Sequence, residues 1–140
     1  MKTRDAISLI SKIREKMNKL IINEMVQNGV EGIVTSHGDI LYALYSKKKM
    51  TMAEIAEKIG KDKSTVTALI DKLVKLEYVT KERNEQDSRV IYVTLTAKGK
   101  ELEPVFEAIS AKILDVFYQG ISEKEKEDLT IILNRIYSNL

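Results

Sequence analysis

The apolar residues at the start of the chain recur every three or four positions, as they do along one face of a helix. They are Ile7, Ile10, Ile13, Met17, Leu20, Ile21 and Met25. The repeat stops where Gly29 and Gly32 interrupt it. The pattern therefore predicts a long amphipathic helix over residues 4–28, with one apolar face available for packing.

A second helical pattern follows, and it begins with a capping signal. Ser36 precedes Asp39 by three residues, an arrangement typical of a helix N-terminus. We expect this helix to end at residues 47–49, where three lysines stand together. Its inward side is predicted to carry Ile40, Leu41, Leu44 and Tyr45.

Two shorter helices are predicted next, separated by a glycine turn. Thr51 and Glu54 form a capping box for a helix that ends at Gly60. Met50 and Ile55 flank this start and are placed for a hydrophobic staple. The following helix is predicted over residues 62–77.

The rest of the chain reads as a hairpin followed by two helices. Alternating apolar and polar residues predict strands at 78–83 and 90–95. A long helix is expected over 97–119, bent or loosened by Pro104, which removes one backbone hydrogen bond. Ser122 and Glu125 are spaced to cap the last helix, which is predicted to run to Leu140. The order indicates a mainly α fold with one small β-hairpin.

The amino-acid composition excludes several kinds of site and location for the chain. With 140 residues, no cysteine and one histidine, we expect a single domain without a disulfide, thiol switch or cysteine-based metal site. No apolar run is long enough for a membrane helix, and charges interrupt the N-terminal apolar positions, so neither a membrane nor a signal peptide is expected. A cytoplasmic protein is predicted.

The charge distribution favours a polyanionic partner. The chain has 23 Lys and Arg against 21 Asp and Glu, a formal net charge of +2. Residues 58–100 hold ten Lys or Arg and six Asp or Glu, a net charge of +4, so the remaining segments together are mildly acidic. A basic centre between acidic ends is expected where the centre faces nucleic acid.

The two shorter helices are spaced as a helix-turn-helix. Ala56 is small enough for two helices to cross, and Gly60, four residues later, suits the positive φ of a tight turn. An apolar stripe at Val66, Leu69, Ile70 and Leu73 then fixes which side of the second helix faces outward. The outward residues that are our candidates for DNA contact are Lys63, Ser64, Thr65, Thr67, Ala68, Lys72 and Lys75. Asp71 lies on the same outward face.

Side-chain chemistry suggests a role for most of these candidates. Small hydroxyls near a helix N-terminus can donate to phosphates or base edges in the major groove, and Lys72 and Lys75 would reach phosphates. Asp71 is expected to pair with Lys75, four residues on. The alternative is a helical hairpin packed only for stability, with a solvated outer face.

The hairpin that follows has opposite charges at its tip. After a helix-turn-helix such a hairpin forms a wing beside the DNA backbone, and the tip candidates are Asp87, Ser88 and Arg89. Arg89 is predicted to enter a minor groove, with Asp87 holding its guanidinium in one rotamer. The alternative is an ordinary surface ion pair.

At this point the chain resembles the MarR/SlyA family of transcriptional regulators. The resemblance lies in STVTALIDKL and NEQDSRVIYVTLTAKG between one N-terminal and two C-terminal helices. It implies a winged helix-turn-helix homodimer on double-stranded DNA, with residues 64–72 in the major groove and Arg89 in the minor groove of a palindromic operator. Two departures are Ala68, where many relatives have arginine, and Glu77, where a glycine is usual.

The resemblance also implies the organisation of the chain. The predicted parts are an N-terminal dimerisation helix at 4–28, a winged helix-turn-helix lobe at 35–96 and C-terminal dimerisation helices at 97–140. A small aromatic or anionic effector would bind between lobe and dimer helices and release the repressor. Its expected contacts are Ile13, Met17, His37, Tyr42 and Tyr45, although Met and Tyr at helical spacing are also ordinary core residues.

The sequence gives less support to a metal-binding protein, an enzyme or a protein-interaction module. One histidine without cysteine does not make a zinc site, and no cofactor is expected. Ser36, His37 and Asp39 are neighbours at a helix start, so their side chains diverge and form no catalytic relay, which argues against an enzyme. The main alternative to a DNA-binding repressor is a winged-helix protein-interaction module without operator specificity.

Overall fold

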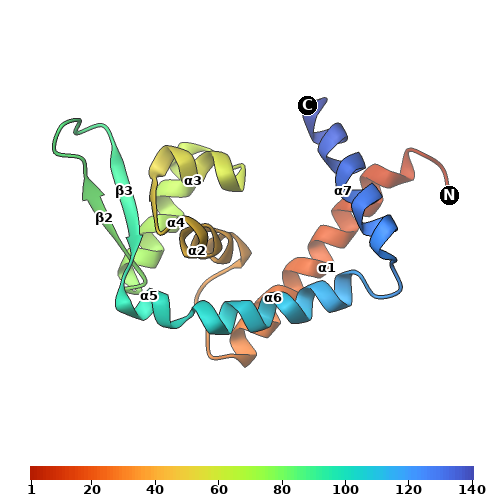
Figure 1. Ribbon diagram of the computed structural model, residues 1–140, viewed down its shortest axis with the longest axis horizontal. Coiled ribbons are helices and arrows are strands. Elements are labelled where there is room, and N and C mark those ends of the chain that lie inside the picture. Colours follow the sequence, from red (N-terminus) through yellow and green to blue (C-terminus); the bar gives the residue numbers. More distant parts are fainter. The chain divides into compact units, whose positions relative to one another are not determined.

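The computed structural model describes all 140 residues and consists of helices and one three-stranded sheet (Figure 1). It divides into two compact units, Met1–Ile109 and Ser110–Leu140, which are described separately. In the first unit the elements are α1 (Asp5–Gln27), α2 (Thr35–Lys47), β1 (Lys49–Thr51), α3 (Met52–Ile59), α4 (Lys63–Lys75), β2 (Val79–Arg83), β3 (Ile91–Leu95) and α5 (Ala97–Glu101). Helix α6 (Glu103–Phe117) crosses the boundary between the units.

The sheet is antiparallel with the strand order β1-β3-β2. The two predicted strands form the wing hairpin, which confirms the winged-helix fold, and β1 is an additional strand that we did not predict. Met50 of β1 lies opposite Val93 of β3. Because β1 has only three residues, it shows no alternation that could identify it.

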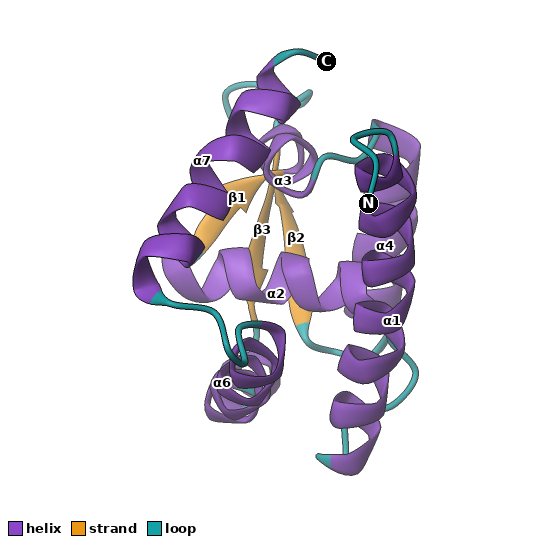
Figure 2. Cartoon of the chain, turned by 90° about the vertical axis from the view of Figure 1, so that its right-hand side faces the viewer, coloured by secondary structure: helices purple, strands orange, loops and turns teal.

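Helices α2, α3 and α4 pack with the sheet around one core (Figure 2). The capping box of α3 is confirmed: Thr51 N donates to Glu54 Oε1, and Glu54 N donates to Thr51 Oγ1, both at 3.0 Å. Gly60 has the expected positive φ of 67°. The fully buried side chains are Met25, Val30, Ile40, Leu41, Leu44, Ile55, Val66, Ile70, Leu73, Val79 and Val93.

The start of α2 differs from the prediction. The helix begins at Thr35, so Ser36 lies inside its first turn and is not the N-cap. The acceptor that closes the turn is His37, whose Nδ1 receives a hydrogen bond from Val34 N at 2.9 Å. An imidazole at the third helical position thus does what Glu or Gln does in an ordinary capping box.

The predicted helix 97–119 is interrupted near its proline. Helix α5 ends at Glu101 and α6 begins at Glu103, with Leu102 between them. Pro104 consequently lies in the first turn of α6, where a backbone N–H has no helical partner in any case. The expected disturbance by Pro104 is confirmed and takes the form of a break.

The second unit contains the end of α6 and α7 (Glu123–Ser138). Ser122 and Glu125 cap α7 reciprocally, as predicted from their spacing. Many large apolar side chains of this unit are exposed: Leu114, Val116, Phe117, Ile121, Ile131, Ile132, Leu133, Ile136, Tyr137 and Leu140. In the chain as a whole, no helix combines the length and the apolar character that crossing a bilayer requires.

Candidate nucleic-acid interface

The N-terminus of α4 is organised by Asp62. Its Oδ1 accepts hydrogen bonds from Thr65 N at 2.8 Å and from Ser64 Oγ at 2.9 Å. These bonds hold the pKa of the Asp62 carboxyl below its usual value, and the bond from Thr65 contributes most. The start of α4 is therefore fixed in direction, with the Ser64 hydroxyl turned toward the cap.

The outward face of α4 carries the predicted residues. Val66, Ile70 and Leu73 are buried, which leaves the opposite side of the helix to solvent. Thr67 Oγ1 donates to Lys63 O at 2.9 Å, so the donor of this hydroxyl is already in use. Thr65 is only partly exposed. The exposed candidates are Lys63, Ser64, Thr67, Ala68, Lys72 and Lys75, and Asp71 is exposed beside them.

Asp71 does not pair with Lys75, and that prediction is wrong. Its Oδ1 lies 2.8 Å from the Nζ atom of Lys81 on β2. The chain turns sharply after α4 and returns along β2, which brings Lys81 beside the helix. The pair therefore links the helix directly to the wing, a contact that helical spacing cannot reveal.

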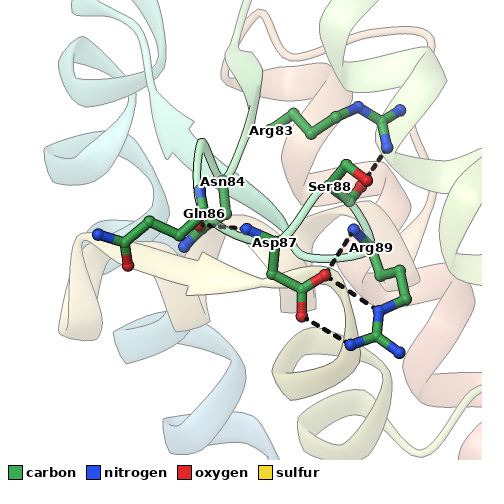
Figure 3. A network of polar contacts seen from close by, with 6 residues as sticks. All are labelled: Arg83, Asn84, Gln86, Asp87, Ser88 and Arg89. Carbon is green, nitrogen blue, oxygen red and sulfur yellow. Dashed lines mark hydrogen bonds and ion pairs between the residues drawn. The ribbon is translucent and has the colours of Figure 1, made fainter.

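The predicted pairing at the wing tip is confirmed (Figure 3). Arg89 Nε lies 3.0 Å from Asp87 Oδ1, and Arg89 Nη2 lies 3.2 Å from Asp87 Oδ2, so the guanidinium binds the carboxylate with two parallel bonds. Arg89 N also donates to Asp87 Oδ1 at 3.0 Å. The Arg89 side chain is nonetheless 89% exposed. It is held in one direction and remains accessible.

The turn that presents Arg89 is built by its neighbours (Figure 3). Asn84 Oδ1 accepts hydrogen bonds from the backbone N–H groups of Gln86 and Asp87 at 2.8 and 3.0 Å. The Arg83 guanidinium donates to the backbone carbonyl of Ser88. The Arg89 side chain lowers the pKa of the Asp87 carboxyl, so this carboxylate stays charged.

Hydrogen bonds connect the C-terminal end of α4 to the segment after the wing. Glu77 has a φ of 66°, so the position where a glycine is usual in the family has a left-handed backbone here. Thr96 Oγ1 donates to Glu77 O at 2.6 Å, and Lys98 Nζ donates to Leu76 O at 3.2 Å. Sequence reasoning did not find Lys81, Arg83 or Lys98, because each acts through a contact with a distant or irregular segment.

The residues predicted to bind an effector occupy different environments. Ile13 and Tyr42 are exposed, and Met17 is half-buried. Tyr45 donates through its hydroxyl to Gly99 O at 2.9 Å, and its ring lies 6.2 Å from that of Phe106. His37 is buried. The side chains contain no group of three or more His, Cys, Asp or Glu placed to hold a metal ion.

His37 makes the stability of the protein sensitive to acid. Burial lowers the pKa of its imidazole below the usual 6.5, and the charge of Lys72 lowers it further. The unfolded chain therefore takes up a proton near pH 6.5 that the folded protein does not. This contribution is complete above pH 6.5 and is lost as the pH falls through the folded-state pKa. We expect the free energy of unfolding, measured with urea, to decrease from about pH 7 to pH 5.

The variant His37→Gln provides the control. Glutamine retains an acceptor for Val34 N and does not titrate. The variant should lose less stability than the wild type over this pH interval. Equal losses in the two proteins would contradict a role for His37.

Three comparisons with known proteins agree with this geometry. Residues 29–90 match the MarR family. The HTH-type transcriptional regulator SarZ of Staphylococcus haemolyticus is 31% identical over 100 residues, which are 71% of this chain and 67% of SarZ. The chain spans 60% to 67% of the length of the SarZ proteins that it matches.

Solved structures share the fold. S. aureus MepR in complex with DNA has a TM-score of 0.84 at 22% identity, covering 100% of this chain and 99% of MepR. A variant of E. coli MarR in complex with operator DNA has a TM-score of 0.82 at 18% identity, covering 97% of this chain and 99% of MarR. At these identities the two structures show that this chain has the same fold.

Proposed function

The chain belongs to the MarR family of winged-helix transcriptional regulators, and from this premise we propose that it binds a palindromic DNA operator as a homodimer and represses transcription. In agreement with the prediction that it is not an enzyme, the family is non-enzymatic. The proposed site of action is double-stranded DNA in the cytoplasm.

The observation that carries the proposal is the pairing of two DNA-binding features in one compact unit. Helix α4 exposes short side chains and lysines, and the wing presents Arg89 on a turn that fixes its direction. A helix of this kind fits the major groove, while a guanidinium fits the negative potential of a narrow minor groove. The residues that would position the protein and read the site are Lys63, Ser64, Thr65, Thr67, Ala68, Lys72 and Lys75 of α4, together with Asp87, Ser88 and Arg89 of the wing.

Dimerisation is supported by apolar surface that each unit leaves exposed. In the first unit Ile7 and Ile10 of α1 are exposed, and in the second unit Ile132 and Ile136 of α7 are exposed. Contiguous apolar surface on helices is normally covered by another protein surface. We propose that a second copy covers it, through the N-terminal helix and the two C-terminal helices. Two-fold symmetry would set the recognition helices about 34 Å apart, one turn of DNA.

Release from DNA is proposed to depend on a small aromatic or anionic effector. Any ligand that changes the separation of the recognition helices changes the affinity for a palindrome, because both half-sites must fit at once. The proposed contacts remain Ile13, Met17, His37, Tyr42 and Tyr45. Of these, Tyr42 has an exposed side chain on α2, whereas the hydroxyl of Tyr45 is already bonded.

The proposal is tested by selecting bound duplexes from a randomised DNA library with the purified protein. We expect enrichment of a palindrome, with binding at a stoichiometry of two chains per duplex. Affinity should fall steeply with salt, because Lys and Arg displace counterions from phosphates. If no sequence is enriched and binding is insensitive to salt, the chain is a protein-interaction module instead.

A further inference from the structure

Asp71 is the only acidic residue of the recognition helix α4. It is exposed and stands one turn from Thr67 and Ala68 on one side and from Lys75 on the other. A carboxylate at this position repels the phosphates that the neighbouring lysines attract. Its presence in the middle of a DNA-binding face therefore requires a physical explanation.

The partner of Asp71 lies between the helix and the wing tip. Val79, Lys81 and Arg83 alternate along β2 and so share one face of the sheet. Val79 is fully buried, and Lys81 lies opposite the buried Val93 in the strand register. This face of β2 is therefore buried in the core at Val79. Toward the wing tip it carries the side chains of Lys81 and Arg83.

The ion pair changes what Lys81 offers to DNA. Lys72 and Lys75 extend from α4 without an ion-pair partner, whereas the Lys81 ammonium is 2.8 Å from Asp71 Oδ1. The side chains of Lys81 and Asp71 remain 37% and 55% exposed, so both are within reach of solvent ions and phosphates. As a pair they carry no net charge.

We propose that Asp71 is a specificity-determining residue. Its ion pair with Lys81 keeps the Lys81 ammonium from contacting DNA phosphates and thereby keeps the affinity for non-operator DNA low. This inference rests on the proposed DNA-binding function. Contacts between cations and phosphates strengthen binding to every sequence equally, so they raise non-specific binding without helping discrimination. When a carboxylate of the recognition helix pairs with one such cation, the affinity for DNA of any sequence falls.

The test compares the wild type with Asp71→Asn on two labelled duplexes, the selected operator and a scrambled sequence of the same length. In Asp71→Asn the acid is gone and Lys81 is free to contact a phosphate. We expect affinity for the scrambled duplex to rise roughly three- to tenfold. The slope of log affinity against log salt should steepen by about one unit per bound chain, and the ratio of operator to scrambled affinity should fall.

The double variant Asp71→Asn/Lys81→Met is the matched control, because it restores a neutral pair and keeps the length of the lysine stem. It should bind the scrambled duplex with the affinity and salt slope of the wild type. A merely structural role of the pair would not produce this reversal of the salt slope.

Other outcomes overturn the inference. If Asp71→Asn leaves both the scrambled affinity and the salt slope unchanged, Lys81 is not withheld. If the variant instead weakens the operator alone and changes the preferred base at one position, Asp71 reads a base edge. If the wild type binds neither duplex, the proposed function itself fails, which is a result distinct from the first two.

Discussion

Replacing Gly99 by alanine is expected to destabilise the protein by about 3 kcal/mol or more, a large part of the stability of a typical domain. A Cβ atom at Gly99 would lie 2.1 Å from Tyr78 O and 3.2 Å from Leu95 Cδ2. The Tyr78 carbonyl cannot move away freely, because it accepts a hydrogen bond from Thr96 N. The effect should appear as a lower midpoint of urea unfolding and a reduced yield of folded protein.

Gly38→Ala provides a matched control. At Gly38 a Cβ would meet Phe106 Cε1 at 3.4 Å, which is ordinary contact, and the residue lies within α2. Alanine favours a helix over glycine by about 0.5 to 1 kcal/mol, so this variant should be as stable as the wild type or slightly more stable. Equal stability of Gly99→Ala and Gly38→Ala would show that α5 can move away from Tyr78.

The requirement at Gly99 illustrates what the sequence could not reveal. Gly99 was part of the motif that identified the family, but its physical reason is the approach of a backbone 21 positions earlier in the chain. Such an approach depends on how β2 and α5 pack, and no local pattern encodes it. The same holds for Asp71, for which helical spacing offered Lys75 while the folded chain supplies Lys81.

Features set by neighbouring residues were predicted well. The caps at Thr51 and Ser122, the turn at Gly60 and the Asp87–Arg89 pair all depend on residues within four positions of each other. The start of α2 was missed although it is also local. There, several polar residues compete for one capping role, and the ring nitrogen of His37 reaches the backbone N–H of Val34. A capping box is usually recognised by Ser or Thr at the N-cap and Glu or Gln at the third helical position, so a histidine at that position was not recognised as the capping residue.

The exposure of the candidate residues on α4 was easier to predict than the contacts that these residues make. The exposed residues of α4 follow from the buried stripe, because the two sides of a helix are complementary. The contacts of Lys81 with Asp71 and of Lys98 with the end of α4 depend instead on the turn at Glu77, whose left-handed backbone sets the direction of β2. The sequence marked Glu77 as unusual but did not specify the resulting neighbours.

Removing the Arg89 side chain is expected to give the largest loss of DNA affinity. The guanidinium is 89% exposed and already held by Asp87, so little side-chain entropy remains to be lost on binding. A loss of about 1 kcal/mol or more at each half-site, with two wings in the proposed homodimer, weakens operator binding roughly thirtyfold or more. Binding measured by fluorescence anisotropy on the selected operator would show this, while urea unfolding should be nearly unchanged because the pair is exposed.

Two further variants separate the shape of the side chain from its charge. Arg89→Lys keeps the charge but not the planar fork, so it should restore the salt slope without restoring operator affinity. Lys124→Ala removes one positive charge from the other compact unit and should leave both quantities near their wild-type values. If Arg89→Ala weakens binding no more than Lys124→Ala, the wing does not enter the groove. Recognition would then rest on α4 alone, and the fork held by Asp87 would be an ordinary surface ion pair.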